Sequence, residues 1–176
     1  MMEFKMLEKM RMIKESMMKN LVIRKAIGED LSNIMEIKKQ VHDLYIEKRP
    51  DIYKKNEVLY TETFLNSFFH NEQRVILVGL LDNEIIGYSF LEILNVQLPM
   101  MVERKYAYIH DFAISENHRH QGTATKMMEY IELYAISRGV FKIELAVHVF
   151  SEDAISLYKK IGFKPRAIRM EKELEL

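Results

Sequence analysis

The sequence has 176 residues, 48% of them hydrophobic, which suffices for one sizeable core and predicts a single globular domain. Its 26 basic residues balance 26 acidic ones, which argues against a general nucleic-acid binder, and the absence of cysteine excludes a disulfide framework, a thiolate metal site and a cysteine nucleophile. No apolar run approaches the roughly 20 residues that span a bilayer, and no signal-type segment opens the sequence, so we expect a cytoplasmic protein with no membrane partner.

Residues 1–20 differ from the rest of the sequence in being rich in methionine and free of glycine and proline. This composition predicts an N-terminal extension that is helical or disordered. Two interpretations stay open: the segment packs on the domain or a partner, or it is a dispensable leader before a translation start at Met17 or Met18. The domain itself is expected over residues 21–176.

The predicted domain opens with a strand at residues 21–25 and a helix from about residue 29 to residue 45. A second apolar-periodic helix is expected over about residues 56–69. Four carboxylates lie in and around the polar connection between these helices: Asp43, Glu47, Asp51 and Glu57. They could attract a cationic amine, but a solvated helix face explains them at least as well.

A hairpin is expected next, with strands at residues 75–81 and 85–94. The following segment, residues 106–114, reads YAYIHDFAI and predicts a half-buried strand. Strict alternation along this strand would place His110 and Asp111 on opposite faces of the sheet.

The segment from Arg119 to Ala124 lies between this strand and an amphipathic helix that Gly139 ends. Gly122 has no Cβ, Ala124 is small, and the first N–H groups of a helix lack intrahelical partners, so the segment predicts a cradle of backbone donors for a pyrophosphate. A connection capped by its own backbone would explain the same pattern if it stood alone. No Rossmann or Walker pattern is present, which disfavours nucleotide sites of those two classes.

A second strand and helix follow, with the strand over residues 141–149 and a short amphipathic helix closed by Gly162. Together the two motifs resemble those of the GNAT superfamily of N-acetyltransferases. The acetyl-CoA loop of that family, Arg/Gln-x-x-Gly-x-Gly/Ala with a branched aliphatic residue five positions earlier, is matched by Ile114, Arg119, Gly122 and Ala124. The later motif of the family is matched by Ala154, Leu157, Tyr158, Gly162 and Phe163, with Ser151 where the family usually has asparagine.

The resemblance implies a single-domain α/β (α+β) fold in which helices flank both faces of a mixed central sheet. It implies transfer of an acetyl group from acetyl-CoA to a small-molecule or protein amine, and a homodimer is frequent in the family. The alternative is a catalytically inactive acetyl-CoA sensor or interaction module. The residues expected to bind acetyl-CoA are Phe112, Ala113, Ile114, Arg119, His120, Gln121, Gly122, Thr123, Ala124, Ser151, Ala154 and Tyr158.

Acetyl transfer from a thioester to an amine requires a neutral amine and a proton for the departing thiolate. Tyr158, with an ordinary pKa of about 10, stays protonated at neutral pH, and the resemblance implies that it is the general acid. His110 is the first candidate for the general base and Asp111 the second, while a base reached through water or purely structural roles for both stay open. His118 and His120 lie near His110 in sequence, but no carboxylate at zinc spacing accompanies them, so no metal is expected.

Overall fold

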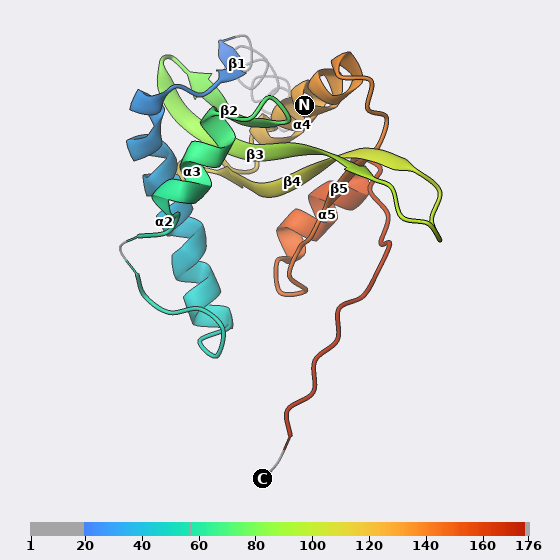
Figure 1. Cartoon of the computed structure of the whole chain (residues 1–176). Helices are drawn as coiled ribbons and strands as arrows, with labels where there is room; N and C mark the ends of the chain where they lie inside the picture. The colour runs from blue at the N-terminus through green and yellow to red at the C-terminus, as the bar shows by residue number, and fades with distance from the viewer. Residues whose placement is uncertain (1–19, 57, 175–176) are drawn as a thin grey trace, which may run out of the picture. The chain divides into compact units, whose positions relative to one another are not determined.

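The computed structural model describes residues 20–56 and 58–174 (Figure 1). The chain divides into two compact units, Met1–Ala146 and Val147–Leu176, and each is described by itself. The predicted N-terminal extension lies outside the described residues, apart from Asn20. None of the described helices is long and apolar enough to cross a membrane.

The first unit contains a five-stranded sheet in the order β1-β2-β3-β4-β5. The first four strands pair antiparallel, and β5 pairs parallel with β4, so the sheet is mixed, as predicted. The strands are β1 (Leu21–Lys25), β2 (Arg74–Leu81), β3 (Glu84–Val96), β4 (Arg104–Ile114) and β5 (Ile143–Leu145). The predicted hairpin is confirmed: Asp82 and Asn83 join β2 to β3 with φ values of 49° and 69°, as a two-residue turn with two left-handed positions requires.

Two helices, α2 (Leu31–Lys48) and α3 (Glu62–Phe69), cover one face of this sheet (Figure 1). Ile34 and Ile37 of α2 and Phe68 of α3 pack with Tyr88 and Phe90 of β3 in one buried cluster. The second helix begins at residue 62, later than the predicted residue 56, because the Thr61 hydroxyl accepts a hydrogen bond from the Phe64 N–H and caps it there.

The opposite face of the sheet is covered by α4 (Thr123–Ser137), which docks on a pair of glycines. Gly79 of β2 and Gly87 of β3 are direct cross-strand partners. The Met127 sulfur lies only 2.9 Å and 2.8 Å from where a Cβ would stand on them, so the lack of side chains at both positions makes room for the helix. Helices therefore flank both faces of the sheet, which confirms the predicted arrangement.

The ladder between β3 and β4 contains a β-bulge at His110. Phe90 pairs with Asp111 and the next residue, Leu91, pairs with Ile109, so His110 is an extra residue on β4. The extra residue interrupts the strict alternation that the sequence predicted. Both His110 and Asp111 consequently face α2 and α3, so the prediction that they diverge is wrong.

The second unit contains one helix, α5 (Glu152–Lys160), among its described residues. It ends as the sequence predicted: Gly162 has a left-handed φ of 101°, and the Phe163 N–H donates to the Tyr158 carbonyl at 2.9 Å. The strand predicted over residues 141–149 is shorter than expected and consists of β5 alone, in the first unit.

Candidate active site

The loop between β4 and α4 has the backbone conformation that an anion cradle needs. Gly122 is the residue before the helix, with φ 93° and ψ −4°, and no side chain caps the helix there. The first i,i+4 hydrogen bond of α4 runs from the Lys126 N–H to the Gly122 carbonyl at 3.1 Å. The N–H groups of residues 123–125 come before this bond, so they have no acceptor within the helix. A helix N-terminus in this state favours a bound anion.

Side chains within the loop fix it to its surroundings. The Arg119 Nε donates to the carbonyl of Ile114 at 3.0 Å, and the Gln121 amide donates to the carbonyl of Asn117 at 2.8 Å. The Gln40 side chain of α2 accepts from the N–H of Glu116 at 3.0 Å. Arg119 and Gln121 therefore hold the loop in shape through its own carbonyls.

The last residues of β4 leave one edge open beside the loop. β5 pairs with β4 only from Ala107 to Ile109. In the part of the chain that the structure describes, the edge of Phe112, Ala113 and Ile114 on that side has no strand partner. A strand edge that lacks a strand partner can pair with the amides of an extended ligand.

His110 lies in a hydrogen-bonded row with two side chains that the sequence had not suggested. Its Nε2 lies 2.7 Å from Glu92 of β3, and the other oxygen of Glu92 accepts from the Arg74 Nε at 2.8 Å. Burial tends to raise the pKa of Glu92, but hydrogen bonds from Arg74 and His110 outweigh it and hold the pKa below its ordinary value. The His110 side chain is 30% exposed, against 12% for Glu92, so the imidazole is the accessible end of the row.

Asp111 belongs to a second cluster on the same face. Its carboxylate accepts from Lys38 of α2 at 2.6 Å and from the hydroxyl of Tyr60. The hydroxyl of Tyr60 lies 3.4 Å from that of Tyr88. An ion pair and a buried phenol thus engage Asp111, the second candidate for the base.

The sequence analysis did not predict the row of Arg74, Glu92 and His110, and the sequence contains only a weak indication of it. Glu92 is the single charged residue in the apolar stretch from Ile85 to Leu94, which marks it as a buried carboxylate in need of a partner. That partner, His110, lies 18 residues away.

The carboxylates near the end of α2 fit the solvated interpretation. Glu47 pairs with Lys48 at 2.9 Å, and Asp51 pairs with Arg49 at 2.7 Å. Glu57 lies outside the described residues.

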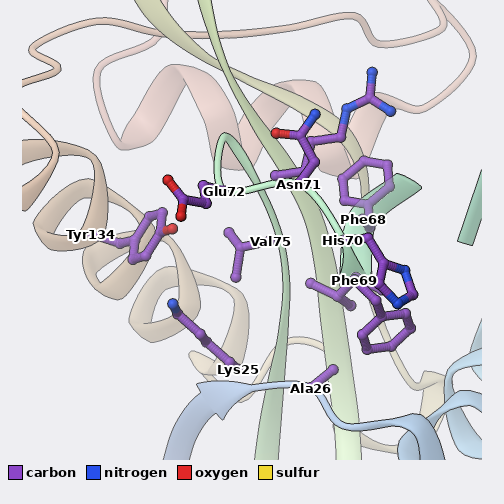
Figure 2. A pocket seen from close by; sticks show the side chains of 11 residues that line it. Lys25, Ala26, Phe68, Phe69, His70, Asn71, Glu72, Val75 and Tyr134 are labelled. Atoms are coloured by element: carbon purple, nitrogen blue, oxygen red, sulfur yellow. The ribbon is translucent and has the colours of Figure 1, made fainter. Parts of the chain in front are cut away.

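A pocket of about 410 Å³ lies at the ends of β1 and α3 and the start of β2. Figure 2 shows Lys25 and Tyr134 on one wall and Phe69 and His70 on the opposite one. It shares Phe68 and Arg74 with the surroundings of His110, but its lining includes none of the residues predicted to act in catalysis or acetyl-CoA binding.

In the second unit, α5 carries the remaining predicted residues. Ser151 precedes the helix and makes no side-chain cap, and its carbonyl accepts from the Ile155 N–H at 3.0 Å. Ala154 lies in the first turn, and the Tyr158 ring packs on Phe163 with centroids 5.5 Å apart.

Comparison with known proteins identifies the family. The model of the Acetyltransferase (GNAT) family matches residues 38–163, a range that includes β4, the loop, α4 and α5. The chain belongs to this family. The resemblance deduced from the two motifs and the predicted α/β fold are thereby confirmed.

Individual proteins are also similar to this chain. An uncharacterized N-acetyltransferase of Bacillus subtilis, YycN, is 32% identical over 68 residues, which are 39% of this chain and 44% of that protein, so the alignment spans less than half of the relative. The N-alpha-acetyltransferase of Saccharolobus solfataricus is 28% identical over 64% of this chain and 72% of its own length. The solved structure of a tetramutant of the BH1408 protein from Bacillus halodurans is 30% identical and superposes with a TM-score of 0.83, over 87% of this chain and 99% of that one.

The first unit thus combines a left-handed Gly122 before an uncapped helix with an edge of β4 that lacks a strand partner. Among the described residues, no group of three His, Asp or Glu side chains could hold a metal ion. His110 is paired with Glu92, away from the loop that contains His118 and His120.

Proposed function

We propose that this protein transfers the acetyl group of acetyl-CoA to a primary amine by direct attack. The observation that carries the proposal is the family match over residues 38–163, which includes both sequence motifs. In the reaction a C–N bond to the acetyl carbon forms and the C–S bond breaks, while one proton leaves the amine and one reaches the sulfur.

The loop at Gly122 is proposed to bind the diphosphate of acetyl-CoA. The backbone N–H groups of residues 123–125 and the positive end of α4 provide the donors, and Arg119 holds the loop against Ile114. The edge of Phe112, Ala113 and Ile114 that has no strand partner is proposed to pair with the pantetheine amides. Ser151 and Ala154 are proposed to contact acetyl-CoA on the strength of the family motif alone.

His110 is proposed as the general base. If its Nε2–H donates to Glu92, its Nδ1 carries the lone pair that accepts the amine proton. An imidazole suits this role, because histidine is the side chain that most often exchanges protons in catalysis. Asp111 is the weaker candidate, since Lys38 and Tyr60 both donate to its carboxylate.

Tyr158 is proposed as the general acid that protonates the departing sulfur. The support is its position in the later family motif, together with a phenol that stays protonated at neutral pH. Family membership carries this assignment.

The acceptor is proposed to be a small-molecule or protein amine. The name of the Saccharolobus relative, N-alpha-acetyltransferase, makes a peptide α-amine one candidate. An α-amine with a pKa of about 7.8 costs about 1 kcal/mol to deprotonate at pH 7, against about 4.6 kcal/mol for a lysine-type amine with a pKa of about 10.4. A general base therefore helps alkylamines most.

The test is release of free thiol from acetyl-CoA in the presence of an amine panel containing peptides, amino acids, polyamines and amino sugars. We expect turnover with at least one class, and a loss of about 10²–10⁴ in rate in His110→Ala. Binding of CoA without turnover of any amine would point to the sensor instead. A cytoplasmic location stays a prediction from the sequence, and a homodimer stays an implication of the family resemblance alone.

A further inference from the structure

We propose that Glu92 and Arg74 are positioning residues that orient the imidazole of His110 for proton transfer. This inference rests on the proposed function, in which His110 is the base. It concerns two residues outside both family motifs.

The three side chains form one row across three strands. Arg74 opens β2, and its cross-strand partner on β3 is Glu92. Glu92 in turn faces β4 next to the bulge, where the extra residue His110 comes within 2.7 Å of it. The row ends at α3, where the Arg74 Nη1 donates to the Ser67 hydroxyl at 2.6 Å and that hydroxyl donates to the Phe64 carbonyl at 2.6 Å.

Three aromatic rings also contact the His110 ring. Phe64, Phe68 and Tyr108 meet it edge-on, at centroid distances of 6.5, 5.7 and 5.0 Å. A rotation of the imidazole would break its hydrogen bond to Glu92 as well as these contacts. The structure therefore fixes which nitrogen faces the protein and which is left for a substrate.

The charges around His110 favour one tautomer. Glu92 is an anion at neutral pH, because the hydrogen bonds from Arg74 and His110 hold its pKa low in spite of burial. Of the other groups nearby, the charge of Asp111 is paired with that of Lys38, and Tyr108 meets the imidazole with the edge of its ring. The Glu92 carboxylate thus accepts from Nε2–H and stabilises the imidazolium that forms when Nδ1 receives a proton.

The first test is an NMR titration of the His110 imidazole, assigned by its loss in His110→Gln. Removal of a facing anion disfavours the imidazolium, so Glu92→Gln should lower the pKa of His110 by about one unit. Glu84→Gln, the same substitution at the exposed start of β3, is the control and should leave it in place. A change of less than about 0.2 units in Glu92→Gln would overturn the proposal. The titration needs neither acetyl-CoA nor amine, so its result is independent of the proposed function.

The second test is a kinetic cycle with an amine that the parent acetylates. Glu92→Gln should reduce kcat/KM by about 10- to 100-fold and move the acid limb of the pH profile to lower pH. In a His110→Ala background the same substitution should cause no further loss of kcat/KM, because a positioning residue acts only through the group it positions. An equal loss in both backgrounds would overturn the proposal. If His110→Ala itself had no effect, the base assignment would fall, whatever the titration showed.

Arg74→Lys provides the graded variant. Lysine keeps the positive charge but cannot bridge Glu92 and Ser67 with a planar fork. We expect the kcat/KM of Arg74→Lys to lie between that of the parent and that of Glu92→Gln. All variants should melt cooperatively. An Arg74→Lys protein that matched the parent in rate and in the pKa of His110 would remove Arg74 from the row.

Discussion

His110 and Asp111 are neighbours on β4, but their surroundings differ. Burial and the adjacent Asp111 carboxylate raise the pKa of Tyr60 and Tyr88 well above the ordinary value, so both phenols remain hydrogen-bond donors at any physiological pH. Tyr60 and Lys38 together occupy Asp111. His110, beside it, is linked to a carboxylate on one nitrogen and is partly exposed, which is the arrangement a proton acceptor requires.

Tyr158→Phe tests the proposed general acid. The substitution keeps the ring and its packing on Phe163 but removes the hydroxyl. We expect stability and CoA affinity to stay near those of the parent and turnover to fall by about 10²–10⁴, or about 3–5 kcal/mol in the barrier. Single-turnover kinetics with an accepted amine measures it. Turnover within threefold of the parent, with chemistry rate-limiting, would assign the proton to water or another residue.

At the scale of elements, the N-terminus of α4 is the feature on which the proposed binding of acetyl-CoA depends. Gly122→Val forces a β-branched residue into a conformation with φ 93°, at a cost of about 1–3 kcal/mol, and places a side chain at the anion site. We expect calorimetry to detect no binding of CoA.

Gly139→Val is the matched control for this variant. Gly139 follows the other end of the same helix with φ 69°, so it carries a comparable strain far from the loop. This variant should lose stability but bind CoA. If Gly122→Val bound CoA as tightly as the parent, the loop would not be the diphosphate site.

The contact between α4 and the sheet predicts a sensitive position in β3. A Cβ at Gly87 would lie 2.6 Å from the Ile114 Cδ1, 2.8 Å from the Met127 sulfur and 3.0 Å from the Ala113 carbonyl oxygen. Because one of these neighbours is backbone, Gly87→Ala should lower the free energy of unfolding by about 1–3 kcal/mol in urea denaturation. Gly28→Ala is the control, since no atom lies within 4 Å of a Cβ there. Equal stability of the two variants would contradict the close docking of α4.

At the scale of the whole molecule, the sequence predicted the elements that carry motifs and missed what depends on pairing between strands. Gly122 and Gly162 are local signals, because their positive φ values of 93° and 101° favour glycine. The bulge at His110 has no such signal, since alternation assumes two residues per repeat and the extra residue is visible only against β3. Glu92 could be suspected as a buried charge, but its partners Arg74 and His110 come from other strands.

The N-terminal extension is testable only on the whole chain. Core patterning begins at Leu21, so deletion of Met1 to Met18 should leave a protein that melts cooperatively and binds CoA with the parent's affinity. Differential scanning calorimetry with and without CoA measures both properties. Loss of the cooperative melt would show that the extension belongs to the fold.

The bulge also bears on how this site can be gained or lost in evolution. Phe90 pairs with Asp111, and Leu91 pairs with Ile109, on either side of the extra residue. A chain that lacked residue 110 could keep both pairs in one regular ladder, with every other side chain on its present face. Insertion or deletion of a single codon could therefore add or remove the histidine while the rest of the sheet stays in register.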